Sequence, residues 1–205
     1  KANIRITSGE STYNVDSFKE YKIVRSKAII DEIDDYICPL YGLTQEETDF
    51  IKNYELIDKD DFQIKDIDIN ILKTSHDTED SNGYIINNKN KSIVNITDTG
   101  YINNKYDNIL KNRDVYLLES NHDIEMLQNS SYPFELRKRI LSDKGHLSNE
   151  DSAKYLTKYI GNNTKYILLA HLSEENNTKE LAYNTLKNKL EKNNIKFNNI
   201  IVLEQ

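Results

Sequence analysis

The pattern of hydrophobic and polar positions predicts an interleaved set of strands and helices over residues 56–205. Apolar and polar residues alternate along residues 62–71, which predicts a half-buried strand. Apolar runs at 83–87 and 92–96 bracket Asn88-Lys89-Asn90 and predict a hairpin. Further strands are predicted at 115–118, 166–170 and 199–203, and helices at 134–141, 149–160 and 178–192. This order predicts an α/β domain.

Residues 1–55 have a different pattern. A short strand is predicted at residues 4–7, before polar turn residues. Isoleucines and Tyr36 recur at three- and four-residue spacing in residues 26–37, which predicts an amphipathic helix that ends at Pro39. Thr44 and Glu47 form a capping box for a second helix. We therefore expect a helical appendage before the α/β domain.

Composition narrows the class of protein. Apolar residues make up 37% of the chain and there are 14 tyrosines, as in a globular protein. The net charge of −7 argues against a generally basic nucleic-acid-binding surface, although a local basic face or bound metal ions could hold phosphate. Because Cys38 is the single cysteine, a disulfide framework and a cysteine-rich zinc site are excluded. The lack of a disulfide framework predicts a cytoplasmic protein. No apolar run is long enough to span a membrane, and the absence of an initiator methionine suggests that the chain begins inside a longer one.

Candidate chemistry gathers at the ends of the predicted strands. His76, Asp98, His122 and His171 each lie at or just past the carboxyl end of a strand. In α/β folds such positions collect reactive groups. Imidazoles with a bridging carboxylate suit Zn²⁺, Mn²⁺ or Fe²⁺, and two ions could activate water and hold a phosphodiester. The alternatives are that Asp98 only caps its Asp-x-Gly turn and that the histidines are structural, since no HxH or HExxH pair is present.

Several blocks of residues 56–205 resemble one family. The chain carries HDTEDSNGY from His76, TDTGY from Thr97, ESNHD from Glu119, GHLSN from Gly145 and LAHLSEENN from Leu169. In order and spacing these blocks resemble the bacterial metallo-β-lactamase-fold hydrolases called YycJ or WalJ. The resemblance implies half of an αββα sandwich, with about five or six strands and helices on one face.

The resemblance also implies roles for individual residues. His76, Asp98 and His171 resemble metal ligands, with Asp98 as the bridge. His146 resembles the histidine that donates a proton to the leaving group in related tRNA-processing members. His122 and Glu119 look like supports that orient the site, with a purely structural role as the alternative. The complete family site implies two divalent metal ions, zinc or manganese.

One part of the family pattern is absent from this sequence. The HxHxDH motif, which supplies most of the family's metal ligands, occurs nowhere in the chain. We therefore expect the chain alone to be weakly active or inactive. The block DYICPLYGLTQEE followed by Phe50-Ile51 instead resembles the C-terminal end of adenine-N6 DNA methyltransferases, whose methyl-donor loop and catalytic motif are also absent. A junction near Glu55 suggests a fusion, a recombined gene, a misassembled reading frame or an engineered chain.

The favoured interpretation is a metal-dependent hydrolase that resembles a DNA exonuclease, with DNA as substrate and no membrane partner. The missing half would leave a sheet face or edge uncovered, so a homo-oligomer or a complementing chain is expected. The alternatives are a DNA- or protein-interacting fragment of a methyltransferase system, with residues 1–55 as its functional part, and a folded remnant without activity.

Overall fold

The structure, a computed structural model, describes residues 7–8, 11–12, 44, 61–78 and 80–204. The chain divides into two compact units, Lys1–Ile57 and Asp58–Gln205. In the first unit, β1 (Thr7–Ser8) and β2 (Ser11–Thr12) form an antiparallel pair. The helices predicted at residues 26–37 and after Thr44 lie outside the described residues and stay predictions.

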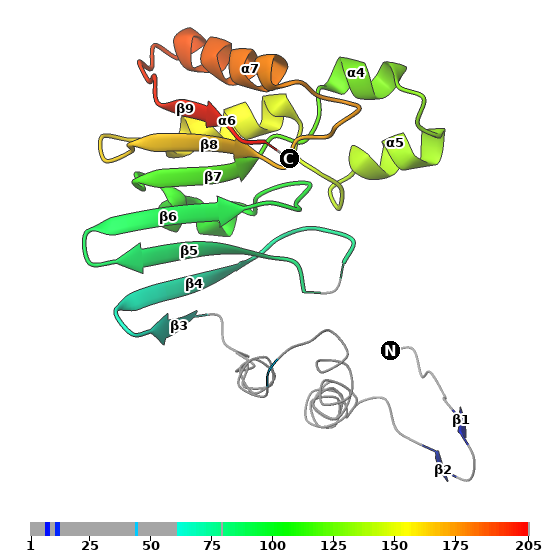
Figure 1. Cartoon of the computed structure of the whole chain (residues 1–205), viewed down its shortest axis with the longest axis horizontal. Helices are drawn as coiled ribbons and strands as arrows, with labels where there is room; N and C mark the ends of the chain where they lie inside the picture. Colours follow the sequence, from blue (N-terminus) through cyan, green and yellow to red (C-terminus); the bar gives the residue numbers. More distant parts are fainter. Residues whose placement is uncertain (1–6, 9–10, 13–43, 45–60, 79, 205) are drawn as a thin grey trace. The chain divides into compact units, whose positions relative to one another are not determined.

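The second unit contains a seven-stranded mixed sheet in which the strands follow one another in sequence order (Figure 1). Strands β3 to β6 pair antiparallel, and β6 to β9 pair parallel. This sheet confirms the predicted α/β class, with one or two strands more than expected. The strands are β3 (Asp61–Ile64), β4 (Ile67–Lys73), β5 (Asn82–Asn88), β6 (Lys91–Ile96), β7 (Val115–Glu119), β8 (Tyr166–Ala170) and β9 (Ile200–Val202).

The prediction of a single strand over residues 62–71 is wrong. The segment is a hairpin, in which Ile64 pairs with Ile67 and Phe62 with Ile69. Lys65 turns the chain with a φ of 55°, in the left-handed region. A two-residue turn places Ile64 and Ile67, which are three residues apart, on the same face of the hairpin, so the apolar positions change from even to odd numbers across the turn. This break in the two-residue alternation is the feature of the sequence that separates two short strands from one long strand.

The helices predicted after Pro133, Ser148 and Asn177 are confirmed. They are α5 (Phe134–Ile140), α6 (Asn149–Tyr159) and α7 (Lys179–Lys192). The side chains of Ser148 and Thr178 cap α6 and α7 by accepting hydrogen bonds from the backbone N–H groups of Asp151 and Leu181. The pattern missed η2 (Asn104–Tyr106), α3 (Asp107–Leu110) and α4 (Ile124–Asn129), which are too short to show a helical period.

Helices α3, α6 and α7 cover one face of the sheet. Their buried residues Leu110, Leu156 and Leu186 belong to the same core as the strand residues Val94 and Tyr116. This layering, one sheet with helices on one face, agrees with one half of a metallo-β-lactamase-like sandwich.

The opposite face of the sheet carries apolar side chains that remain accessible to solvent. Ile93, Val115 and Tyr166 lie side by side in the register of β6, β7 and β8. Because side chains alternate along a strand, these residues point away from the buried Val94 and Tyr116. Ile93 is 41% exposed and Tyr166 49%. The uncovered sheet face that the sequence predicts is therefore present.

The parallel strands bring several loops to one end of the sheet. Helices α4 and α5 lie beyond the end towards which β6 and β7 run (Figure 1).

None of the helices that the structure describes is both long and apolar enough to cross a membrane.

Candidate metal centre

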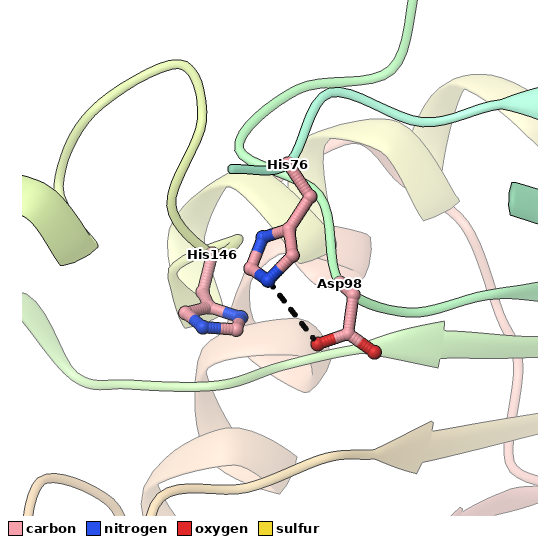
Figure 2. A group of neighbouring side chains, drawn as sticks. All are labelled: His76, Asp98 and His146. Carbon is pink, nitrogen blue, oxygen red and sulfur yellow. Dashed lines mark ion pairs between the residues drawn. The ribbon is translucent and has the colours of Figure 1, made fainter. Parts of the chain in front are cut away.

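The loops that follow β4 and β6 form one wall of the site. The backbone N–H of Gly100 donates to the carbonyl of Ser75 at 2.9 Å, and the backbone N–H of Ser75 donates to the hydroxyl of Thr99 at 3.1 Å. These bonds hold His76 beside Asp98, so that its Nε2 lies 3.8 Å from Asp98 Oδ1 (Figure 2). Two of the predicted ligands therefore face each other.

His171 follows β8 directly and also lies beside Asp98. Its Nε2 lies 3.7 Å from the same Asp98 Oδ1. One carboxylate oxygen thus lies between two imidazole nitrogens. Two ligand atoms on one tetrahedral zinc lie ~3.3 Å apart, given zinc bonds of about 2.0–2.1 Å. The observed separations are slightly longer, so a small inward movement of the side chains would let Asp98 share an ion with either histidine. Among the described residues, no group that could hold one ion contains both His76 and His171.

Both Asp98 and His171 have an unusual backbone conformation. Their φ angles are 52° and 58°, in the left-handed region, which non-glycine residues adopt infrequently. Such conformations occur at functional sites, where the surrounding structure fixes them. Here Ser81 Oγ donates to the carbonyl of Asp98, and Asn121 Nδ2 donates to the carbonyl of His171. Asn121 is a supporting residue that the sequence analysis did not single out.

His146, in the loop between α5 and α6, joins the group. Its ring centroid lies 4.8 Å from that of His76 and 5.3 Å from that of His171. Figure 2 shows its ring beside His76 and Asp98. Among the described residues, two groups could hold a metal ion: His76, Asp98 and His146, and Glu119, His146 and His171.

Glu119 at the end of β7 connects the parts of the site. Its side chain is fully buried, and its Oε1 lies 2.6 Å from Nδ1 of His146 and 2.7 Å from Nδ1 of His171. Its Oε2 accepts the backbone N–H groups of Thr99 and Leu147. Burial raises the pKa of the Glu119 carboxyl, but the hydrogen bonds from the two histidines outweigh it, so the pKa lies below its ordinary value.

These hydrogen bonds fix the tautomers of the histidines. A carbonyl or carboxylate oxygen can only accept, so the partner Nδ1 must carry the hydrogen. This holds for His146 and His171 on Glu119, and for His76, whose Nδ1 lies 3.0 Å from the carbonyl of Gly145. Nε2 of each neutral ring is then left with a lone pair, as a metal ligand requires. The hydrogen bond to Glu119 also raises the pKa of His171.

His122 does not join either group of candidate ligands. It is 1% exposed, and neither ring nitrogen has a hydrogen-bond partner in the structure. Burial lowers its pKa to about 4, so the ring is neutral at pH 7. Its backbone supports the site instead, because its carbonyl accepts the N–H of Asn149.

A second set of contacts attaches α5 to the site. Arg139 on α5 forms an ion pair with Asp77, next to His76, which lowers the pKa of the Asp77 carboxyl. Gly100 packs against the backbone of the following loop so closely that a Cβ there would lie 2.4 Å from the carbonyl oxygens of Ser142 and Asp143. Neither contact is predictable from the sequence, because the partners are far apart in the chain.

Comparison with known proteins gives relatives for part of the chain. It is 50% identical to the exodeoxyribonuclease WalJ of Streptococcus pneumoniae over 125 residues, which are 61% of this chain and 46% of that protein. It is 42% identical to the exodeoxyribonuclease YycJ of Bacillus anthracis over 126 residues, 62% of this chain and 48% of that protein. The chain thus spans about half the length of the curated relatives it matches. No protein-family model matches it.

Solved structures give weaker similarities. The metallo-beta-lactamase fold protein YhfI from Bacillus subtilis is 14% identical with a TM-score of 0.48, over 70% of this chain and 50% of that one. A diphosphatase from the PhnP family is 14% identical with a TM-score of 0.46, over 73% of this chain and 45% of that one.

The resemblance of residues 1–55 to DNA methyltransferases stays a prediction, since none of the relatives and solved structures named above bears on it.

Proposed function

We propose that this chain carries one side of the active site of a metal-dependent phosphodiesterase that acts on DNA. The proposal rests on one arrangement of side chains. The buried carboxylate of Glu119 holds the rings of His146 and His171, and His171 lies beside a second carboxylate, Asp98. The class of substrate rests on the similarity to two exodeoxyribonucleases, each of which the chain covers by about half.

Three residues would hold divalent metal, zinc or manganese. His76 and His171 offer Nε2, and Asp98 offers a carboxylate oxygen between them. This donor set of nitrogen and oxygen suits either ion. When bound, such ions supply a water activated at neutral pH and a positive charge for the phosphodiester oxygens.

His146 is the residue that we assign to proton transfer. Its Nδ1 donates to Glu119, which leaves Nε2 free to carry a second proton, and the buried carboxylate stabilises the resulting imidazolium. Donation of that Nε2 proton to the leaving oxygen returns the ring to its neutral form. Glu119 keeps the ring oriented in both states and stays ionised.

Two substitutions distinguish this role from that of a ligand. If His146 is a proton donor, His146→Ala abolishes turnover but leaves metal binding within about twofold. If His146 is a ligand, the same change lowers metal affinity as much as His76→Ala does. Glu180→Gln, in an exposed carboxylate of α7, is the matched control.

The function itself is tested with the purified chain. We expect weak metal binding, reduced further by His76→Ala, Asp98→Asn and His171→Ala, and slow hydrolysis of an end-labelled oligonucleotide at enzyme excess that a chelator abolishes. Titration calorimetry with Zn²⁺ and Mn²⁺ measures metal binding, and gel analysis measures hydrolysis of the oligonucleotide. Metal binding that none of the three substitutions changes would refute the assignment of the site. Two tightly bound ions and many turnovers would refute the expected weakness of the chain alone.

A further inference from the structure

An apolar groove with a basic border lies on α4 and α5. Its volume is about 530 Å³, and its lining residues are Gln128, Phe134, Arg137, Lys138, Leu141 and Ser142. Phe134 is 68% exposed and Leu141 45%. Phe134 and Leu141 are seven residues apart, with Arg137 and Lys138 between them at helical spacing, so α5 and the residue after it present all four on one side.

The groove is fixed to the candidate metal centre. The carbonyl of Ile140, at the end of α5, accepts the backbone N–H of His146 at 3.0 Å. Arg139, on the same helix, pairs with Asp77 beside His76. A molecule held in the groove therefore has a defined position relative to the histidines, because α5 and the site share these contacts.

The chemistry of the groove selects one kind of ligand. An exposed aromatic ring in an apolar hollow is a stacking surface, and every nucleobase has a face that can stack on it. Two cations and no carboxylate line the groove, in a chain of net charge −7. Arg137 donates to the carbonyl of Gln128, whereas Lys138 has no ion-pair partner among the described residues, so its charge is available to a phosphate. Apolar stacking surface beside free positive charge is what a single-stranded nucleic acid requires.

We propose that the groove of α4 and α5 binds a nucleobase of single-stranded DNA, stacked on Phe134 with the adjoining phosphate at Lys138, while a phosphodiester further along the same strand lies at the histidine site. The inference rests on the proposed function and adds to it the form of the substrate and the residues that position it. Both residues are positioning residues, since neither belongs to the candidate metal centre.

The stacking is tested by binding in the presence of a chelator, which separates it from hydrolysis. A single-stranded oligonucleotide containing 2-aminopurine is titrated with the whole chain. We expect the fluorescence of the probe to be quenched on binding, and Phe134→Ala to weaken binding about tenfold and remove the quenching, whereas Phe134→Trp retains both. Ile109→Ala, which removes an exposed apolar side chain from α3, is the control.

The phosphate contact is tested by salt dependence. We expect Lys138→Ala to reduce the slope of log affinity against log salt concentration by about 0.7, as for one lost contact to a single strand. Lys154→Ala, in an exposed lysine of α6, should leave the slope unchanged.

A blunt duplex should bind more weakly than the single strand, because its bases are not free to stack on Phe134.

Several outcomes would overturn the inference. Equal affinity and equal quenching for wild type and Phe134→Ala would exclude the stacking surface. A dimer in light scattering that Phe134→Ala dissociates, with DNA binding unchanged, would assign the groove to a second copy of the chain. Hydrolysis that requires Asp98 without any dependence on Phe134 would leave the proposed function standing and refute this groove. Binding that depends on Phe134, without any hydrolysis, would support the groove and refute the proposed function.

Discussion

At the scale of single residues, Glu119 has the largest effect on the geometry of the site. It is buried, yet its two oxygens accept four hydrogen bonds, two from histidine rings and two from backbone N–H groups. A buried carboxylate is stable only when its oxygens are satisfied in this way. Glu119 thereby sets the tautomers of His146 and His171 and holds their Nε2 atoms ready for a metal ion or a proton.

We predict that Glu119→Gln lowers the affinity for Zn²⁺ by about 10- to 100-fold. The amide offers one acceptor oxygen, and its NH₂ group would face hydrogen-bond donors. Titration calorimetry measures the affinity, and circular dichroism checks that the variant is folded. Glu125→Gln, in an exposed carboxylate of α4, is the control. Unchanged affinity in a folded Glu119→Gln variant would show that the histidines need no carboxylate partner.

His122 makes stability depend on pH. Its pKa is lowered to about 4 in the folded chain, against an ordinary value of 6.5. A histidine with a depressed pKa stabilises the fold above its unfolded pKa, and this contribution is lost as the pH falls below 6.5 towards 4. Between pH 7 and pH 5 the loss amounts to about 2 kcal/mol.

We therefore predict that His122→Leu reduces the loss of stability between pH 7 and pH 5 by about 2 kcal/mol. Urea unfolding of wild type and variant at both pH values measures the difference. The comparison is between slopes, so the titration of other groups and any cavity in the variant cancel. Identical slopes would mean that His122 is protonated at pH 5 in the folded chain.

At the scale of elements, the site depends on how closely three loops approach one another. Gly100, after β6, lies against the backbone of residues 142–143, and Gly145 lies against the carbonyl of Ile140 at the end of α5. The carbonyl of Gly145 in turn accepts from His76. The loop between α5 and α6 thus positions His146 and also orients His76.

We predict that Gly100→Ala moves this loop and lowers metal affinity about tenfold or more, because the new methyl group would lie 2.4 Å from backbone oxygens that cannot rotate away. The variant should also unfold at a lower temperature. Gly161→Ala is the comparison, since its nearest contact is the Asn112 side chain, and both residues precede the starts of β8 and β7, at the opposite ends of these strands from Glu119 and His171. Calorimetric titration and thermal unfolding measure the two effects. Full metal affinity in Gly100→Ala would show that the loop is free to adjust.

At the scale of the whole α/β unit, the sheet has one covered and one open face. The covered face contributes Val94, Tyr116 and Ile167 to the core with α3, α6 and α7. On the open face, Ile93 is 41% exposed, Ile201 45% and Tyr166 49%. Apolar area of this extent favours association with another apolar surface.

We predict that the chain self-associates through this face. The mass measured by light scattering should rise with protein concentration, and Tyr166→Lys together with Ile201→Lys should keep the chain monomeric. Ile109→Lys, an equally exposed isoleucine on α3, is the control and should not change the mass. A monomer at high concentration in the unsubstituted chain would contradict the prediction.

The sequence by itself determined most of the α/β unit. Local signals are sufficient for strands of regular alternation such as β5 and β6, and for helices with a cap such as Ser148 before α6, because these depend on neighbouring residues. The positions of Asp98 and His171 at strand ends were also visible, since a parallel sheet carries such ends to one edge.

Only the tertiary structure decided which of the strand-end residues meet. His122 follows β7 as His171 follows β8, yet its ring is buried without a partner, whereas the loop residue His146 enters the site. The left-handed backbone of Asp98 and the contacts of Glu119 were equally invisible in the sequence. The reason is physical: these features arise from contacts between residues 17 to 69 positions apart, and side-chain direction there depends on packing rather than on local periodicity.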